Sequence, residues 1–123
     1  MEYSGFLQIT QSEAGGDSEE TERAVRAVLT TLAERLSRDE ARDLLQRLPV
    51  EIRPWLHTER SAERFDVGEF LRRVAEREGV DLESAERDAR AVFAALREAV
   101  GHDEYADLTV RFPPDYGVLL PRP

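Results

Sequence analysis

The sequence of 123 residues contains no cysteine, no lysine and no long run of apolar residues. The absence of cysteine excludes disulfide bonds and thiolate metal sites, and it is consistent with a reducing compartment. No apolar stretch approaches the roughly 20 residues that span a bilayer, and the first residues lack the basic and then apolar pattern of a secretion signal. We therefore expect a cytoplasmic protein without a membrane segment.

Negative charge dominates the chain. It carries 26 acidic residues against 17 basic ones, all of them arginine, for a net charge of −9. Nucleic acids and anionic membranes both select clustered positive charge, so neither is expected as a partner. We interpret the use of arginine for every basic residue as a bias of the coding sequence. The functional alternative is a surface whose planar guanidinium groups pair with carboxylates or phosphates. Because the arginines are scattered among acidic residues, they predict no anion-binding patch.

Apolar residues recur at spacings of three and four along most of the chain, which is typical of amphipathic helices. The clearest pattern covers residues 81–100, DLESAERDARAVFAALREAV, and a similar one covers 17–36. Shorter helices are predicted over 2–11, 38–47, 50–56, 66–79 and 103–111. Aspartates at or near helix starts are interpreted as N-terminal caps, namely Asp17, Asp39, Asp81 and Asp103, and residues 17–20, 37–40 and 66–69 are interpreted as capping boxes. We therefore predict an all-α fold, a compact helical bundle of about 6–8 helices.

The chain also contains an internal repeat. When residue 17 is aligned with residue 81, residues 17–36 match residues 81–100. The same alignment extends without a gap, so that residues 6–56 match residues 70–120. We call this offset the repeat shift. Two copies are too few for a solenoid, so we expect one globule in which the apolar face of each half covers the other. We predict a single helical domain over 1–123, built from two pseudo-symmetric repeats, 2–56 and 66–120, and a linker, 57–65.

Three segments carry a family resemblance. The second repeat contains FLRRVAEREGV at residues 70–80 before its alanine-rich helix, and the first contains LAERLS at 32–37 and LPVE at 48–51. Together with the duplication, these segments resemble the bacterial domain-of-unknown-function family 2267 over nearly the whole chain. The resemblance implies a small, all-helical, mostly prokaryotic soluble protein. It supplies no activity, substrate or catalytic residue.

The first helix departs from the pattern of the second repeat. Thr10 and Gly16 stand where the second repeat has Val74 and Val80. Gly5 also weakens this helix, because glycine costs about 1 kcal/mol in a helix interior. Looser packing of the first helix is therefore expected.

No catalytic, cofactor-binding or metal-binding constellation is predicted. His57 and His102 are the only histidines, they fall in predicted loops, and they do not correspond under the repeat shift, so they are interpreted as exposed loop residues. Acid–base catalysis by carboxyl pairs requires at least one carboxyl in an apolar setting. The pattern assigns the acidic residues to polar helix faces or to caps, which argues against such a pair.

Three residues are candidates for contact with a ligand or partner. Arg26 and Arg90 occupy equivalent positions in the two repeats and would form an anion site if they met near a pseudo-twofold axis; the simpler interpretation is a surface arginine paired with Glu22 or Glu86. Trp55 would suit the anchor of a protein interface. A lone tryptophan in a domain of this size is more often part of the core.

Function is therefore expected to rest on binding. The leading hypothesis is a non-enzymatic helical protein that acts by association, with itself or with another protein. The alternative is a small-molecule or anion-binding domain with its site between the two halves. An enzyme is the third hypothesis, and it would require a buried glutamate or histidine in a cleft.

Overall fold

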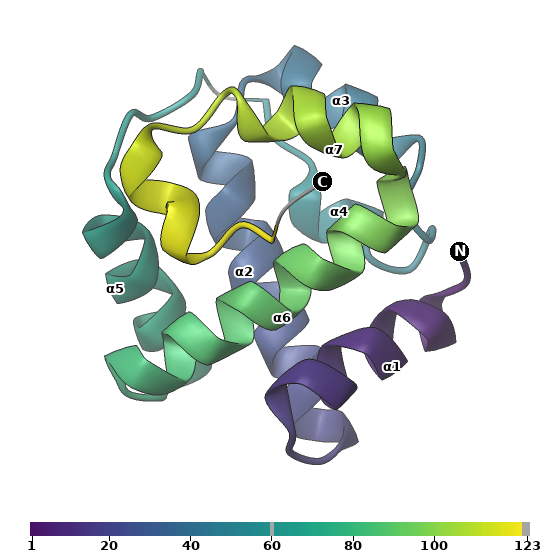
Figure 1. The fold of residues 1–123 in the computed structure, drawn as a ribbon, viewed down its shortest axis with the longest axis vertical. Helices are drawn as coiled ribbons and strands as arrows, with labels where there is room; N and C mark the ends of the chain where they lie inside the picture. Colours follow the sequence, from purple (N-terminus) through teal and green to yellow (C-terminus); the bar gives the residue numbers. More distant parts are fainter. Residues whose placement is uncertain (60, 122–123) are drawn as a thin grey trace.

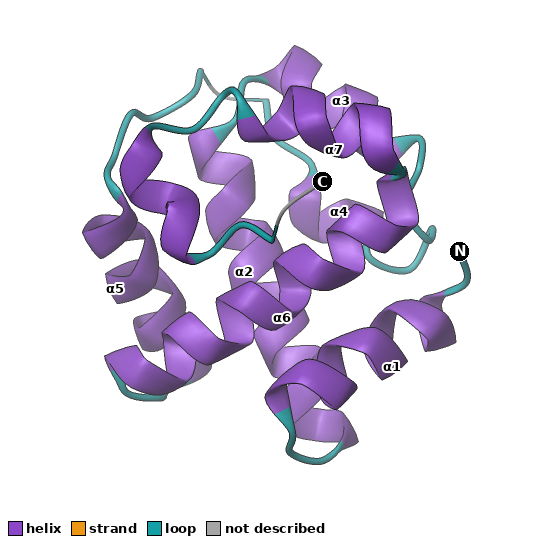
Figure 2. Ribbon diagram, viewed as in Figure 1, coloured by secondary structure: helices purple, strands orange, loops and turns teal. Residues whose placement is uncertain are grey.

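The computed structural model describes residues 1–59 and 61–121, and this part of the chain consists of helices joined by loops and turns, without a strand (Figures 1 and 2). The helices are α1 (Tyr3–Ala14), α2 (Ser18–Arg35), α3 (Arg38–Leu45), α4 (Arg53–Leu56), α5 (Val67–Glu78), α6 (Leu82–Val100) and α7 (His102–Thr109), followed by the 3-10 turn η1 (Pro114–Val118). The all-α prediction and the expected number of helices are confirmed. Within the described ranges, no helix has the length and apolar character needed to cross a membrane.

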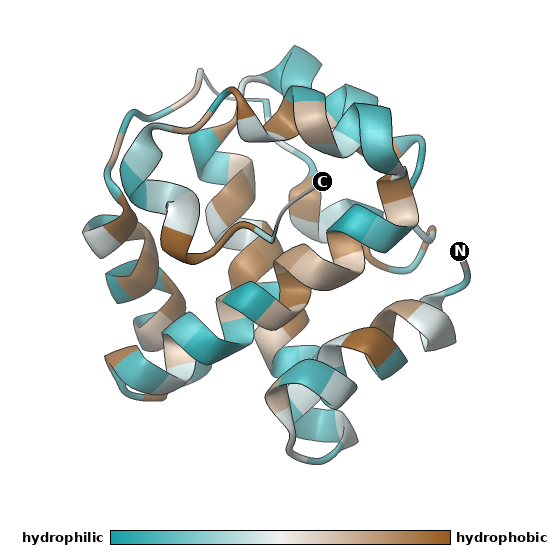
Figure 3. Ribbon diagram, viewed as in Figure 1, coloured by the Kyte–Doolittle hydropathy of each residue, from teal (hydrophilic) through white to brown (hydrophobic). Residues whose placement is uncertain are grey.

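The two long helices form the centre of the bundle. α6 crosses in front of α2 in Figure 1, and the two helices are in contact. α1 packs along α6, whereas α5 packs against both α2 and α6. Figure 3 shows brown, apolar stretches of α2 behind the middle of α6. The hydrophobic core therefore lies around this crossing, with α3, α4 and α7 at one end.

Aromatic rings close the core between α5, α6 and η1. The ring of Phe70 lies 6.1 Å from that of Phe93 and 5.7 Å from that of Tyr116, measured between ring centroids. All three side chains are fully buried. Burying an aromatic side chain of this size contributes about 1.5–3 kcal/mol, so these rings are a major part of what holds α5 and η1 on α6.

Local signals in the sequence set the ends of the long helices as expected. The Asp17 carboxylate accepts a hydrogen bond from the Glu20 N–H at 2.9 Å, and the Glu20 carboxylate accepts one from the Asp17 N–H at 3.1 Å. The Asp81 carboxylate accepts from the Ser84 N–H at 2.8 Å. Gly79 ends α5 with φ +74°, a left-handed conformation that glycine adopts without strain.

Two of the predicted caps are wrong. In α3 the capping box predicted over residues 37–40 is confirmed, because the Ser37 hydroxyl oxygen accepts a hydrogen bond from the Glu40 N–H at 3.2 Å and the Glu40 carboxylate accepts one from the Ser37 N–H at 2.8 Å. α7 begins after Gly101 without a side-chain cap. Asp39 and Asp103 instead lie inside the first turn of their helices. There a carboxylate stabilises the positive end of the helix dipole without capping it.

The expectation of a loosely packed first helix is also wrong. Thr10 is fully buried, and its hydroxyl donates a hydrogen bond to the Phe6 carbonyl oxygen at 3.0 Å. Because its one polar group is satisfied within α1, the threonine can replace the valine of the second repeat inside the core.

Candidate functional site

A pocket of about 180 Å³ lies where the end of α1 and the start of α2 meet the end of α5 and the second turn of α6. Its lining consists of Thr10, Ala14, Gly15, Gly16, Glu20, Thr21, Arg23, Ala24, Glu78, Val80, Arg87 and Asp88. Two carboxyl side chains of this set are buried, Glu78 with 8% of its surface exposed and Asp88 with 7%. The pocket therefore combines an acidic interior with contacts from four helices.

The helix periodicity explains why these carboxyls point inward. Glu78 is the last residue of α5, one turn after Val74 and two turns after Phe70, and both of these side chains are fully buried. Asp88 lies three positions after Ala85 and four positions before Val92 on α6, and both of these side chains are fully buried. Each acid thus continues an apolar face into the space between the helices.

The electrostatic environment favours one shared proton over two negative charges. Burial, a hydrogen bond to Asp88 and the negative charge of Asp88 raise the pKa of the Glu78 carboxyl to about 9. Arg87 and Arg23 act in the opposite direction but do not outweigh these causes. At neutral pH the Glu78–Asp88 pair therefore holds one proton between its two carboxyls.

One atom of this pair has no partner. Oε2 of Glu78 is buried and forms no hydrogen bond within the part of the chain that the structure describes. The Asp88 carboxylate is only loosely paired, since its Oδ1 atom lies 3.4 Å from Nε of Arg87. An unpaired buried polar atom costs about 1–3 kcal/mol, so the pocket offers an acceptor that a donor would satisfy.

Sequence reasoning missed both carboxyls. The assignment of all acidic residues to polar faces or caps is wrong for Glu78 and Asp88. Two signals were available in the sequence. Glu78 follows Val74 at the spacing of the apolar series, and under the repeat shift Glu78 and Asp88 match the alanines Ala14 and Ala24.

The three residues predicted from the sequence lie elsewhere. Arg26 and Trp55 line a second, open groove of about 430 Å³ between α2 and the segment around α4, and Trp55 is partly buried against the core. Arg90 lies on α6, where Nη2 is 3.4 Å from Oε2 of Glu86. It lines neither that groove nor the 180 Å³ pocket. A ligand or partner role for these residues stays a prediction.

Arginines also have structural roles in this protein. Arg35 is buried with 4% of its surface exposed, and its Nε donates a hydrogen bond to the Phe65 carbonyl oxygen at 3.1 Å. Its guanidinium lies 5.5 Å from the ring centroids of both Phe112 and Tyr116. Contacts of a cation with aromatic faces contribute about 0.5–2 kcal/mol, so this arginine ties α2 to the C-terminal segment.

Ion pairs join α2 to α5. Nη1 and Nη2 of Arg77 donate to the Glu34 carboxylate at 2.7 and 2.9 Å, and Nη1 of Arg73 donates to it at 3.2 Å. The hydrogen bond from Arg77, before other causes, lowers the pKa of Glu34. The Glu69 carboxylate accepts from Arg72 and Arg73 instead of completing the expected capping box. These groups satisfy one another, and most of them line an open groove of about 260 Å³.

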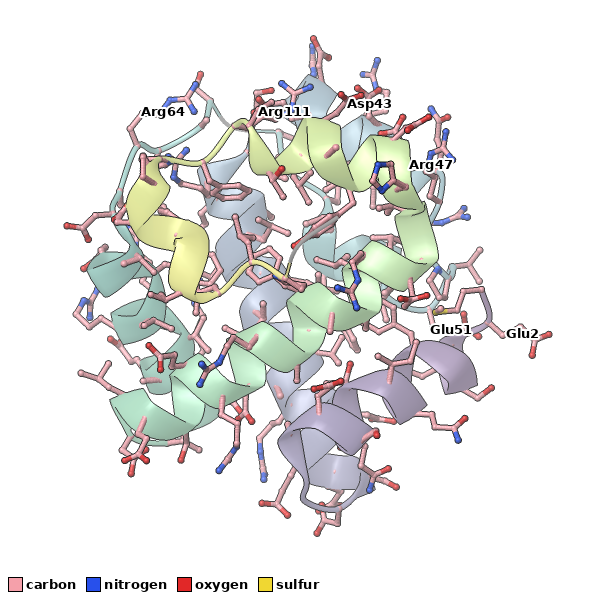
Figure 4. The ribbon with its side chains drawn as sticks, viewed as in Figure 1. Glu2, Asp43, Arg47, Glu51, Arg64 and Arg111 are labelled. Carbon is pink, nitrogen blue, oxygen red and sulfur yellow. The ribbon has the colours of Figure 1, made fainter. Side chains whose placement is uncertain are left out.

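A second set of ion pairs joins α3 to α7. Nη1 of Arg111 lies 2.9 Å from Oε2 of Glu40, and Nη2 of Arg47 lies 3.5 Å from Oε1 of Glu104. Figure 4 labels Arg47 and Arg111 together with Asp43 at this end of the molecule. Among residues 1–59 and 61–121, no group of three or more histidine or acidic side chains is arranged to hold a metal ion.

The chain was compared with known proteins. The model of a family described as "uncharacterized conserved protein (DUF2267)" matches residues 3–119. No curated protein matches the chain.

Proposed function

This chain belongs to the DUF2267 family of uncharacterized conserved proteins, and we propose that it is a non-enzymatic protein that binds a small polar molecule in the pocket over Glu78 and Asp88. The observation that carries the proposal is the buried Oε2 atom of Glu78, which has no partner among the described residues. Buried polar groups in folded proteins are nearly always paired, with water or a ligand where the protein supplies no partner. A pocket beside such an atom is therefore a reasonable site for a ligand.

The internal repeat supports a site between two halves. Under the repeat shift, the bounds of α1 coincide with those of α5 at both ends, and the bounds of α3 coincide with those of α7. The ion pairs between α3 and α7 are reciprocal under the same shift, which relates Arg47 to Arg111 and Glu40 to Glu104. A pseudo-twofold arrangement of two repeats accounts for both observations.

This arrangement also accounts for the polarity of the pocket. Arg23 and Arg87 are equivalent under the shift, and both line it. The equivalents of Glu78 and Asp88 are alanines, which line it too, at positions 14 and 24. The two halves thus differ here, because one supplies two carboxyls and the other supplies the space beside them.

The hydroxyls of the pocket favour binding over nucleophilic catalysis. Thr10 donates its proton to the Phe6 carbonyl, and Thr21 donates to the Asp17 carbonyl at 2.9 Å. Neither hydroxyl is therefore activated by an adjacent base, as a catalytic nucleophile requires. Glu78 does meet the condition set for an enzyme, a buried glutamate in a cleft, but neither lining threonine is available to it as a nucleophile, so the function that we propose for the carboxyl pair is to bind a hydrogen-bond donor.

A ligand screen read by NMR tests the proposal. The full chain is titrated with small sugars, polyols, amides, amines, carboxylates and amino acids, and backbone amide shifts are followed. We expect at least one class to perturb the amides around Glu78 and Asp88 and to raise the melting temperature. Glu78→Leu, which removes both side-chain oxygens, should weaken that response, whereas Glu76→Leu, an exposed change on the same helix, should not. If no class perturbs these amides, the proposal is wrong.

Association is the second candidate function. A groove of about 700 Å³ at the N-terminal end is lined by Met1 and Val50, which are 49% and 63% exposed, and by Glu2 and Glu51, labelled in Figure 4. Exposed apolar side chains beside charged ones favour a protein contact. Light scattering over a range of concentrations tests self-association, and a Val50→Asp variant should remain monomeric if this groove is the interface. A mass that stays at one chain length at every concentration would argue against self-association.

A further inference from the structure

The polar groups of the pocket are separated by depth. Glu78, Asp88 and Thr21 are buried and form what we call its floor, whereas Arg23 and Arg87 are exposed and form what we call its rim. Nε of Arg87 nevertheless reaches from the rim to within 3.4 Å of Oδ1 of Asp88. A ligand that enters the pocket therefore meets negative charge and acceptor oxygens at its inner end, and positive charge at its outer end.

On the basis of the proposed binding function, we infer that the ligand is a small zwitterion of the amino-acid type, with its ammonium group at Glu78 and Asp88 and its carboxylate at Arg23 and Arg87. The match is electrostatic at both ends. A ligand of a single charge would leave one of the two ends uncompensated.

The floor suits an ammonium group for two reasons. It offers acceptor atoms, Oε2 of Glu78 and the Asp88 carboxylate, and an ammonium group supplies three donors. The floor also holds the Asp88 charge, whose ion pair among the described residues is the loose one to Arg87 at 3.4 Å. A buried charge with weak compensation favours a cationic partner over a neutral one.

The rim suits a carboxylate. Guanidinium groups bind carboxylates through parallel hydrogen bonds, and Arg23 lines the rim without an ion pair to any described acidic residue within 4 Å. The third charged residue at the rim, Glu20, is occupied in the cap of α2, where its Oε1 accepts the Asp17 N–H. It therefore competes little for the arginines.

The size of the pocket limits the ligand. A volume of 180 Å³ corresponds to about six water molecules at roughly 30 Å³ each. A molecule of about seven non-hydrogen atoms fits this space, and 4-aminobutyrate has that size. Butyrate and butylamine are matched probes, because the first lacks the ammonium group and the second lacks the carboxylate.

The protonation of Glu78 gives this inference a pH signature. The charged residues that line the pocket with it are Asp88 and Arg87 from α6 and Glu20 and Arg23 from α2, and the lining residues of α1 carry no charge. A bound ammonium group would favour loss of the shared proton. Binding should therefore tighten as pH rises from 7 towards 9, where an alkyl ammonium with a pKa near 10.4 is still charged.

Calorimetric and NMR titrations of the full chain with these three probes test the inference. We expect 4-aminobutyrate to bind at least tenfold more tightly than butyrate or butylamine and to perturb the amides of Glu78 and Asp88. Asp88→Asn should remove the difference in affinity between 4-aminobutyrate and butyrate. Arg23→Gln should remove the difference in affinity between 4-aminobutyrate and butylamine. Glu98→Gln, an exposed change on α6, is the control and should change neither ratio.

The outcomes separate the two proposals. If butyrate or a neutral probe binds at Glu78 as tightly as 4-aminobutyrate, the zwitterion inference is wrong while the binding function stands. The zwitterion inference is also wrong, and the binding function also stands, if the only compounds of the wider screen that perturb these amides are not zwitterions. If no compound perturbs them, both proposals fail. Should Asp88→Asn not fold, the comparison of the three probes on the unmodified chain decides the question by itself.

Discussion

The substitution Glu78→Gln should stabilise the protein at neutral and alkaline pH. In the folded state Glu78 keeps its proton because burial and Asp88 raise its pKa to about 9. In the unfolded state the same carboxyl ionises with a pKa of about 4.3. The unfolded state thus binds fewer protons between these values, so the free energy of unfolding falls as pH rises through this window. A glutamine has no proton to lose, and its amide can still donate to Asp88.

The size of the effect follows from the same linkage. Each pH unit inside the window removes about 1.4 kcal/mol from the stability of the unmodified chain. At pH 7, about 2.7 units above the unfolded pKa, the accumulated loss is roughly 3–4 kcal/mol. For a domain of this size 1 kcal/mol shifts the melting temperature by roughly 3–4 °C. We therefore expect Glu78→Gln to melt about 10 °C higher at pH 7 and near the unmodified chain at about pH 4.5.

Thermal and urea unfolding, followed by circular dichroism from pH 4.5 to 8.5, measures the effect. The quantity of interest is the difference between the variant and the unmodified chain at each pH, because other titrating groups cancel in that difference. Glu76→Gln is the matched control, since it makes the same chemical change at an exposed position of α5. If the stability curves of Glu78→Gln and the unmodified chain run parallel over this range, Glu78 is ionised in the folded protein and the shared-proton account is refuted.

Two further substitutions test the packing around the site. Glu34→Gln removes the carboxylate charge that Arg73 and Arg77 share and should lower the free energy of unfolding by about 1–2 kcal/mol at pH 7. Urea titrations at low salt and in 1 M salt measure this loss, which should be smaller in 1 M salt because salt screens ion pairs. An equal loss under the two conditions would contradict an ionic origin. Gly79→Ala forces a side chain into the left-handed region and should cost about 1 kcal/mol, whereas Gly117→Ala, at a glycine without positive φ, should cost less. Equal melting temperatures for the two alanine variants would show that the turn after α5 carries no such constraint.

Local chemistry explains which parts of the fold were predictable. Asp17 and Asp81 cap helices through hydrogen bonds to residues three positions away, and Gly79 ends one through its own backbone conformation. Such signals act within one helical turn, so they are readable without knowledge of the tertiary fold. The prediction was wrong at Asp39 and Asp103, where Ser37 and Gly101 precede the helices. At α3 the Ser37–Glu40 capping box still marked the start in the sequence, whereas α7 begins without a side-chain cap.

The carboxyl pair was not predictable in the same way. Glu78 and Asp88 lie on different helices, and each by itself resembles an ordinary acidic residue near a helix surface. Only the packing of α1 and α2 over the junction between α5 and α6 buries them side by side. Their shared proton depends on that burial and on their proximity. Both are absent in the unfolded chain, so neither of them raises the pKa of Glu78 there.

The sequence by itself thus determined the all-α architecture and the main helix ends, since periodicity and capping are properties of neighbouring residues. It also placed the chain near a known family through short motifs. The tertiary structure decided which charged side chains left water, as Arg35, Glu78 and Asp88 did. Burial is a property of the whole fold, and it turns common charged residues into a cation held among aromatic rings and a protonated acid beside a pocket.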